Sequence, residues 1–182
     1  VDTIAFDKTG TLTYGKLEVS DVLSFSPELS KDKLLYLAAS AEAKSEHPLG
    51  KAIVAYAKKL DLPPSESAAF QMTSGKGISA EVDGYQLLCG NEKYLQECGV
   101  SVTANADAAL EKLRLQGKAS ILVAVNGQCL GVIALSDVLR PEAAAMVQKL
   151  TAMQTNTVLL TGDNQKTADY FAAQVGIREV YA

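Results

Sequence analysis

The 182 residues carry 17 Lys and Arg against 21 Asp and Glu, a net charge of -4, and 48% of them are hydrophobic. This length and composition predict one domain, or two small ones, with a buried core. The acidic balance provides no basic field for nucleic acid or an anionic membrane surface. The apolar runs at 121–125 and 132–135 are far shorter than the ~20 residues of a membrane helix, and no signal-peptide pattern opens the chain. Three scattered cysteines without a CxxC motif favour reduced thiols.

Two apolar runs near the ends of the chain predict parallel strands. VDTIAF at 1–6 and TVLL at 157–160 are each followed by a polar loop that contains glycine. Amphipathic helices are expected at 141–153, with proline at the first helical position, and at 165–175. The order strand, helix, strand, helix predicts one parallel α/β layer that a long insertion interrupts.

The insertion begins with two predicted helices, at 34–43 and 49–60. They are joined by KSEHP, in which Pro48 should open the second helix and force His47 out of the helical region. Two further helices are expected at 91–99 and 104–116.

Two hairpins follow from dipeptides that favour tight turns. Asp83-Gly84 and Asn126-Gly127 each lie between alternating apolar runs, as a two-residue hairpin turn requires. The insertion is therefore expected to be an antiparallel sheet covered by helices.

Asp7 is the first candidate for chemistry. A carboxylate at the end of a buried strand, followed by the backbone donors of a Thr-Gly-Thr turn, is suitably placed to attack phosphorus and form an acyl phosphate, and Lys8 adds positive charge. The Thr161 hydroxyl and the Gly162 N–H could bind phosphoryl oxygens, and Asp163 could hold Mg²⁺ or orient the loop. TGDN by itself is more typical of an Asx-type turn that caps a helix, and DKTGT upstream reverses this balance.

DKTGTLT at 7–13 followed by TGDN at 161–164 resembles the phosphorylation domain of P-type ATPases, which belong to the haloacid dehalogenase superfamily. The resemblance extends over the whole chain and implies a partial, Rossmann-like phosphorylation domain at 1–18 and 136–182, with an inserted α+β nucleotide-binding domain at 19–135. It implies that Mg²⁺ is held in part at Asp7 and Thr9. Superfamily phosphatases usually carry an acid where Thr9 stands, and a hydroxyl cannot take a proton from water, so the aspartyl phosphate should persist.

Motifs in the insertion resemble the heavy-metal P1B class. SEHP at 45–48, an upstream Glu, GKG at 75–77 and GN at 90–91 fall in the expected order, which implies an ATP site. The residues that this resemblance places in the site are Glu42, His47, Gly75, Gly77, Gly90 and Asn91. A His at a helix N-terminus should stay neutral and available to adenine, Glu42 can accept a hydrogen bond from an exocyclic amine, and the glycines permit close approach to a ribose or phosphate.

Each motif also has a simpler interpretation. A His before Pro is most often an exposed loop residue, and a carboxylate on a helix surface is normally solvated. Gly-x-Gly is a common turn, and Gly90-Asn91 could only start a helix. Similarly, Asp137 and Arg140 resemble the hinge of these ATPases but could be a helix cap and a surface Arg.

The resemblance implies an ATP-hydrolysing metal pump with ATP and Mg²⁺ as cofactors, for which copper export is favoured. Its partners would be ATP or ADP, the membrane helices and actuator domain of the same polypeptide, and a metal ion bound elsewhere, in a cytoplasmic domain of an integral membrane protein. The GDGxND loop of the family does not appear, so we expect this chain to bind nucleotide but to form aspartyl phosphate poorly. The alternatives are a zinc or cadmium pump, a soluble phosphatase of the superfamily, and a nucleotide-binding module without chemistry.

Overall fold

The structure is a computed structural model that describes residues 1–182, and the chain divides into two compact units. Unit 1 comprises Val1–Lys16, Lys112–Lys118 and Ser136–Ala182, and unit 2 comprises Leu17–Glu111 and Ala119–Leu135. The helices are α1 (Lys31–Glu42), α2 (Pro48–Lys59), α3 (Glu92–Glu97), α4 (Ala104–Leu115), α5 (Ala143–Ala152) and α6 (Gln165–Val175). None of them is long and apolar enough to cross a membrane.

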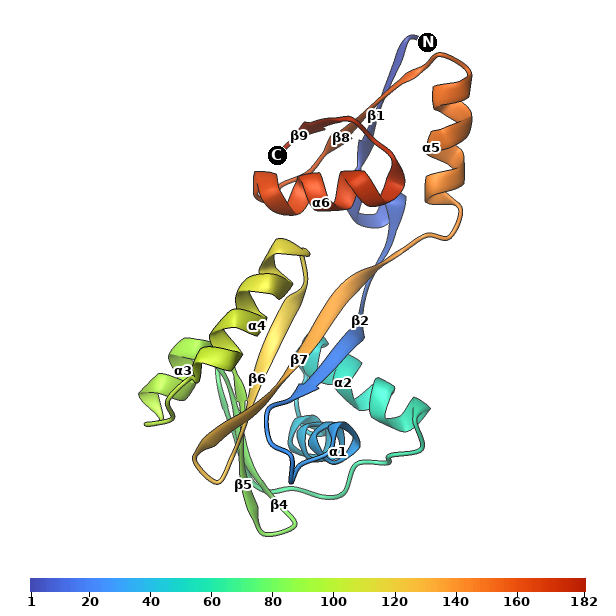
Figure 1. Cartoon of the computed structure of the whole chain (residues 1–182). Coiled ribbons are helices and arrows are strands. Elements are labelled where there is room, and N and C mark those ends of the chain that lie inside the picture. Colours follow the sequence, from blue (N-terminus) through green and yellow to red (C-terminus); the bar gives the residue numbers. More distant parts are fainter. The chain divides into compact units, whose positions relative to one another are not determined.

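Unit 1 contains a parallel three-stranded sheet in the order β1-β8-β9 (Figure 1). Its strands are β1 (Thr3–Asp7), β8 (Asn156–Leu160) and β9 (Glu179–Tyr181). The core between this sheet and helices α5 and α6 includes Phe6, Val147, Leu159 and Val175. The predicted pair of parallel strands is confirmed, and α6 spans the residues expected for it.

Helix α5 begins later than predicted. Proline was expected at its first position, but the helix starts at Ala143. The N–H of Ala143 bonds the carbonyl of Arg140, so Arg140 to Ala143 form a β-turn with Pro141 at its second position. Proline favours that position because its φ is fixed near the value the turn needs.

Unit 2 contains an antiparallel sheet, as the two hairpin signals predicted (Figure 1). The full sheet has six strands in the order β2-β7-β6-β5-β4-β3. The strands are β2 (Thr13–Ser24), β3 (Ala68–Thr73), β4 (Gly77–Val82), β5 (Tyr85–Gly90), β6 (Ala119–Val125) and β7 (Gln128–Leu139).

The predicted hairpin turns are confirmed by their backbone angles. Asp83 and Gly84 have φ of 50° and 81°, and Asn126 and Gly127 have φ of 49° and 81°. Positive φ at both central residues is the type I′ geometry that matches the twist of the flanking strands.

The sheet of unit 2 is covered on both faces. Ile121, Val123 and Val125 of β6 belong to a core cluster with the apolar side chains of α1 and α2. Leu122 and Ala124 alternate with them and are also buried. Because successive strand residues point to opposite faces, the apolar run 121–125 of β6 is buried on both faces of the sheet, and Figure 1 shows α3 on the side opposite α1 and α2.

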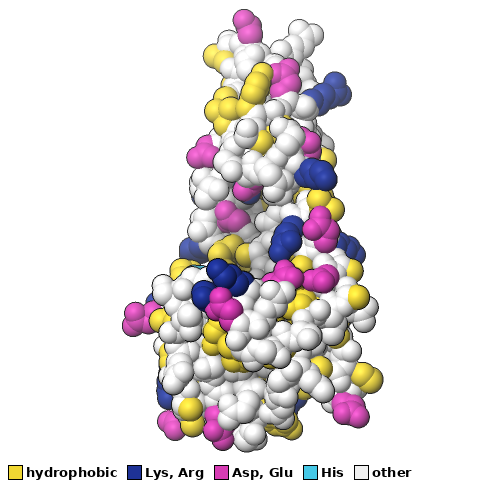
Figure 2. All heavy atoms as spheres, turned by 90° about the vertical axis from the view of Figure 1, so that its left-hand side faces the viewer, with side chains coloured by type: hydrophobic (Ala, Val, Ile, Leu, Met, Phe, Trp, Pro, Cys, Tyr) yellow, Lys and Arg dark blue, Asp and Glu magenta, His cyan; other side chains and the backbone are white.

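The face of the molecule drawn in Figure 2 does not carry charges of a single sign. Figure 2 shows acidic and basic side chains interspersed over the visible face. This distribution agrees with the nearly balanced charge count of the sequence.

Candidate functional site

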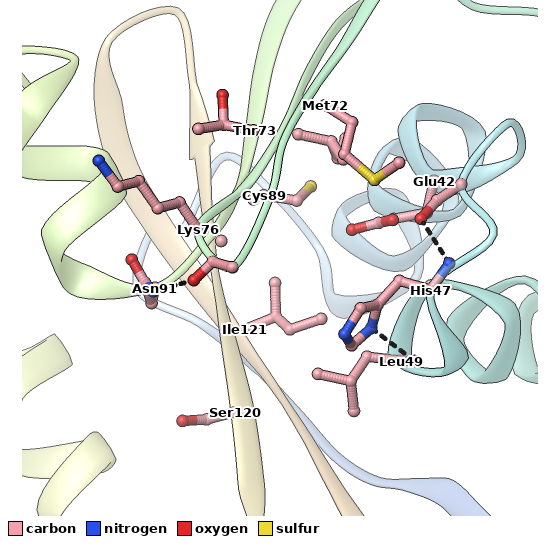
Figure 3. Close-up of a pocket in the computed structure, with 16 residues that line it drawn as sticks. Glu42, His47, Leu49, Met72, Thr73, Lys76, Cys89, Asn91, Ser120 and Ile121 are labelled. Atoms are coloured by element: carbon pink, nitrogen blue, oxygen red, sulfur yellow. Dashed lines mark hydrogen bonds between the residues drawn. The ribbon is translucent and has the colours of Figure 1, made fainter.

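A cavity of about 200 Å³ lies in unit 2, between the start of α2, the end of α1 and the strands β4, β5 and β6 (Figure 3). It is lined by Glu42, Ser45, His47, Leu49, Gly50, Met72, Thr73, Gly75, Lys76, Gly77, Ile78, Cys89, Gly90, Asn91, Ser120 and Ile121. All six residues that the sequence singled out as nucleotide-binding are among them. Cavities for drug-sized ligands measure about 300–1,000 Å³, so this one has room for a base rather than for an entire nucleoside triphosphate.

Glu42 lies inside this cavity rather than on a solvated helix surface. It is the last residue of α1 and is only 5% exposed. Burial raises the pKa of its carboxyl to about 7, and a hydrogen bond with the Ser45 side chain partly offsets this rise. The simpler interpretation of Glu42 as an exposed charge is therefore wrong.

His47 is the residue that precedes α2. Its backbone is extended, with φ -67° and ψ 138°, because Pro48 follows it and opens the helix, as predicted. The imidazole Nδ1 accepts a hydrogen bond of 3.2 Å from the N–H of Leu49. An imidazole that accepts at Nδ1 carries its proton on Nε2, so His47 retains one donor for a ligand. The side chain is exposed, as the simpler interpretation also predicted.

Gly77 and Gly90 face each other across the β4–β5 ladder. A Cβ on Gly77 would collide with the carbonyl of Cys89 and would lie 2.7 Å from the Cα of Gly90. The structure therefore gives these glycines a packing role between the two strands. Gly75 differs, because its φ of 71° lies in the left-handed region that favours glycine.

Asn91 connects two walls of the cavity. Its Oδ1 accepts a 2.8 Å bond from the N–H of Tyr94, which caps α3, and its Nδ2 donates to the carbonyl of Gly75 at 3.2 Å. The helix-cap interpretation of Asn91 is thus correct, and the same side chain also fixes the turn that carries Gly75.

Two further titratable side chains border the cavity. Lys76 forms an ion pair with Glu97 at 2.7 Å. The Cys89 thiol is buried, and burial together with the negative charge of Glu42 raises its pKa.

The second group of candidate residues lies at the carboxyl edge of the parallel sheet in unit 1. Asp7 ends β1 and pairs in register with Leu160, the last residue of β8. Because β1 and β8 are parallel and adjacent, Asp7 and the TGDN loop lie at the same sheet edge, which is where ligands bind in open α/β sheets. Asp7 is solvent-exposed, as is Thr9 in the turn η1 (Lys8–Leu12).

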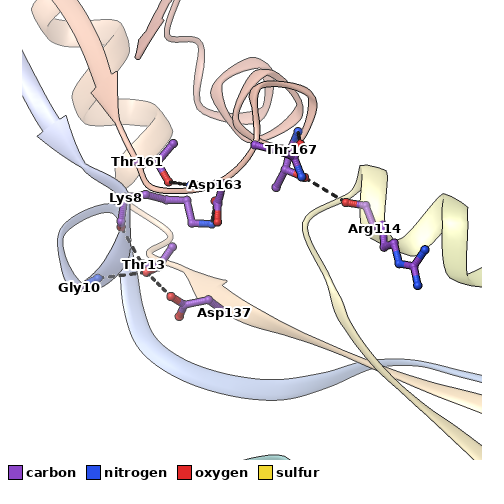
Figure 4. A network of polar contacts seen from close by, with 9 residues as sticks. Lys8, Gly10, Thr13, Arg114, Asp137, Thr161, Asp163 and Thr167 are labelled. Atoms are coloured by element: carbon purple, nitrogen blue, oxygen red, sulfur yellow. Dashed lines mark hydrogen bonds and ion pairs between the residues drawn. The ribbon is translucent and has the colours of Figure 1, made fainter. Parts of the chain in front are cut away.

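Lys8 and Asp163 bring the two motifs into direct contact (Figure 4). The Lys8 ammonium forms an ion pair with the Asp163 carboxylate, and their side chains are 14% and 33% exposed. The N–H of Asp163 donates to the Thr161 hydroxyl at 3.2 Å. Asp163 therefore positions Lys8 and shapes the loop, while Asn164 caps α6 by accepting from the N–H of Thr167.

Hydrogen bonds of three residues stabilise the turn that follows Asp7. Thr13 is fully buried, and its hydroxyl donates to Asp137 at 2.6 Å and accepts from the N–H of Gly10 at 3.2 Å. Arg140 donates to the carbonyls of Thr13 and Gly10. The surface-Arg interpretation of Arg140 is therefore wrong, because its guanidinium holds the backbone of the DKTGT turn.

The sequence motifs do not assign a role to several residues that form these sites. Ser45 and Thr13 belong to SEHP and DKTGTLT, but these motifs give no sign of the hydrogen bonds that the two side chains make. Leu49, Met72 and Ile121 form apolar parts of the cavity wall. No motif marks them, because they come from three segments that only the fold brings together.

Few side chains of this chain are placed to act as ligands of Mg²⁺. No group of three or more His, Cys, Asp or Glu side chains is close enough to hold a metal ion. Mg²⁺ is usually bound by one or two carboxylates together with substrate phosphate and water, so a single exposed carboxylate such as Asp7 fits one part of such a site.

Comparison with known proteins gives consistent matches over the whole chain. The haloacid dehalogenase-like hydrolase family matches residues 1–182. Copper-exporting P-type ATPase B of Archaeoglobus fulgidus is 38% identical over 182 residues, which are 100% of this chain and 26% of that protein.

Two solved structures are also similar to the whole chain. A zinc-transporting PIB-type ATPase in its E2.Pi state matches with a TM-score of 0.87 and 37% identity, over 100% of this chain and 29% of that one. The catalytic domain of the CPx-ATPase CopB-B matches with a TM-score of 0.70 and 29% identity, over 100% of this chain and 62% of that one.

The chain thus spans about a quarter of the length of the copper-exporting relative. Its sequence is similar to one region of heavy-metal P-type ATPases from end to end, and its fold is that of the same region in solved structures. The chain belongs to the haloacid dehalogenase-like hydrolases.

Proposed function

We propose that this chain is the ATP-binding and phosphorylation region of a heavy-metal-transporting P-type ATPase. The observation that carries the proposal is the cavity of unit 2, which gathers Glu42, His47, Asn91 and two glycine-containing turns from separate segments. In this proposal residues 19–135 are the nucleotide-binding domain, and residues 1–18 with 136–182 belong to the phosphorylation domain. The protein would then be a membrane pump with this region on the cytoplasmic side.

The cavity suits an adenine base. Apolar side chains from α2, β3 and β6 can contact the faces of the ring, while Glu42 and the Nε2–H of His47 supply polar partners at its edge. The turn around Gly75 leaves backbone groups accessible to the ribose and phosphates.

The proposed reaction at unit 1 is transfer of the γ-phosphoryl group to Asp7. A carboxylate oxygen of Asp7 forms a bond to the γ-phosphorus, the bond from that phosphorus to the β,γ-bridging oxygen breaks, and ADP leaves with the electron pair. Lys8, the Thr161 hydroxyl and the Gly162 N–H are placed at the same sheet edge and can stabilise the transferred oxygens. Asp7 and Thr9, together with phosphate oxygens, would hold Mg²⁺, whose positive charge would offset the negative charge of the phosphoryl group.

Thr9 favours a long-lived intermediate. An acyl phosphate is hydrolysed when a nearby base takes a proton from water, and a Thr hydroxyl cannot act as that base near neutral pH. A persistent aspartyl phosphate suits a pump, in which the intermediate has to last through a conformational change.

Nucleotide binding to this chain is the direct test. We expect ATP to bind, and His47→Gln to weaken the affinity about tenfold, because a flexible Gln amide lacks the imidazole ring and does not hold a donor at the position of the imidazole Nε2–H; titration calorimetry measures this. Asp7→Asn is the comparison variant, because Asp7 belongs to unit 1, whereas the cavity lies in unit 2. Equal affinities of wild type and His47→Gln would remove the support for the nucleotide site.

The transported ion is proposed to be copper. The similarity to a copper-exporting ATPase supports this choice, while the similarity to a zinc-transporting ATPase of known structure supports zinc as the second candidate. ATPase activity of the full-length protein with Cu⁺ or with Zn²⁺ separates the two. A soluble phosphatase would instead hydrolyse p-nitrophenyl phosphate without stimulation by Cu⁺ or Zn²⁺.

A further inference from the structure

We propose that Glu42, as a neutral carboxylic acid, hydrogen-bonds the edge of the bound base. Protonation of this one side chain then determines the preference for ATP over GTP. The inference deepens the proposed nucleotide site and rests on it. It adds to that site a specificity determinant and a dependence of base selection on pH.

The first support is the position of the carboxyl. Figure 3 shows the Glu42 side chain directed into the cavity, on the same side as the imidazole of His47. A Cβ on Gly50 would lie 2.5 Å from its Oε2, so the absence of a side chain at the start of α2 makes room for this carboxyl. Cys89, Ile78 and Ile121 line the same cavity, which leaves Glu42 in largely apolar surroundings.

The charged and titratable groups around Glu42 come from three places. His47 precedes α2, Cys89 lies on β5, and Lys76 lies in the turn before β4. The ammonium of Lys76 is engaged by Glu97 at 2.7 Å, and Lys44, two residues after Glu42, donates to the carbonyl of Ser67. Neither Lys ammonium is paired with Glu42, and a buried carboxyl without a paired cation favours its neutral form. This is consistent with the pKa of about 7 that burial gives to Glu42.

The two protonation states present different hydrogen-bonding patterns. A neutral acid has one O–H donor and one acceptor oxygen, which match the N1 acceptor and the N6 amino donor of adenine. An ionised carboxylate only accepts, and two acceptor oxygens match the N1–H and N2 amino donors of guanine. A group that changes state near neutral pH can therefore exchange one base preference for the other.

The decisive experiment measures the dissociation constants of ATP and GTP for the wild-type chain at about pH 6 and about pH 8.5. The ratio of the GTP constant to the ATP constant is the readout, because both ligands carry the same triphosphate, whose ionisation affects both constants alike. For a group titrating near 7, the proportion of the neutral to the ionised form falls from about 10 at pH 6 to about 0.03 at pH 8.5. Because each base binds one form in this proposal, we expect the ratio of the GTP constant to the ATP constant to fall about 300-fold.

A second measurement does not depend on any substitution. If ATP binds the protonated form, binding near neutral pH takes up protons, and GTP binding releases them. Calorimetry in buffers of different ionisation enthalpy reports this exchange, and equal proton uptake with both nucleotides would contradict the inference.

Glu42→Gln and Glu46→Gln form a matched pair. A Gln amide donates and accepts at the same time, so Glu42→Gln should keep a constant ratio across this pH range, close to wild type at the lower pH and about 300-fold above wild type at the higher pH. Glu46 is exposed and does not line the cavity. The ratio of the two dissociation constants should therefore change with pH in Glu46→Gln as it does in the wild type.

The outcomes separate the inference from the function on which it rests. No nucleotide binding at any pH would overturn the proposed function and this inference with it. ATP binding with a ratio that does not change with pH in the wild type would overturn the inference alone.

Discussion

The burial of Glu42 predicts a measurable loss of stability as pH rises. Glu42 is 5% exposed, and its pKa is raised from the ordinary value of 4.5 to about 7 in the folded chain. Because the folded-state pKa lies above the unfolded-state value, the unfolded chain loses this proton first. The stability that Glu42 contributes is complete below about pH 4.5 and is lost as pH rises through about 7.

The size of the effect follows from the same values. One pKa unit corresponds to about 1.4 kcal/mol, so a rise from 4.5 to about 7 lowers the free energy of unfolding by about 3 kcal/mol at high pH. Glu42→Gln removes the titration and retains an amide that can bond Ser45. We therefore expect Glu42→Gln to be close to wild type near pH 5 and more stable by about 2–3 kcal/mol above pH 8.

Urea unfolding followed by circular dichroism at several pH values measures this difference. Comparing variant with wild type at each pH cancels the titration of the other groups. Glu46→Gln makes the same change of net charge four residues further along, at an exposed position, and should not show the gain in stability above pH 8. A constant difference for Glu42→Gln would refute the assignment of a proton to the buried carboxyl near neutral pH.

Three further substitutions test the packing and capping of the sites by thermal unfolding. Gly77→Ala should lower the stability by about 1–3 kcal/mol, because its Cβ would collide with the adjacent strand β5, and an unchanged midpoint would contradict the close contact. Asn91→Ala removes the cap of α3 and the bond to Gly75, so it should lower the stability by about 1 kcal/mol and also weaken ATP binding. If stability and ATP affinity were both unchanged, the cap would be dispensable. Thr13→Val leaves the partly buried Asp137 without its 2.6 Å donor, so the free energy of unfolding should fall by about 1–3 kcal/mol. The double variant Thr13→Val with Asp137→Asn should lose less stability than the sum of the two single variants.

Base selection by a neutral acid would connect the two properties of Glu42. The surroundings that raise its pKa cost stability at high pH, and in the proposed site the same surroundings provide a donor and an acceptor for adenine. An ordinary solvated Glu would be ionised near neutral pH and would accept only.

Some features of this chain were determined by short stretches of sequence. Asp83-Gly84 and Asn126-Gly127 have the positive φ values of type I′ turns because Gly, Asn and Asp tolerate them. Pro48 begins α2 and keeps His47 extended, since a residue before proline is excluded from the helical region. These predictions were correct because the deciding interactions lie within a few residues.

Strands without an apolar alternation could be recognised only in the folded chain. Strand β2 is largely exposed along its first half and lies at the edge of the sheet beside β7, so its sequence has no strand pattern. Strand β3 is the other edge and contains an irregular register against β4. Pairing with a neighbour, rather than propensity, makes both segments strands.

The order of motifs from DKTGT to TGDN was sufficient to predict the family and the candidate residues. Only the tertiary structure decided their environments. Glu42 is buried because α1, the start of α2 and β5 meet around it, and Lys8 is paired with Asp163 because β1 and β8 are adjacent. Burial and charge pairing are long-range properties, which depend on segments that the sequence places far apart, whereas turn and cap geometry is fixed by neighbours along the chain.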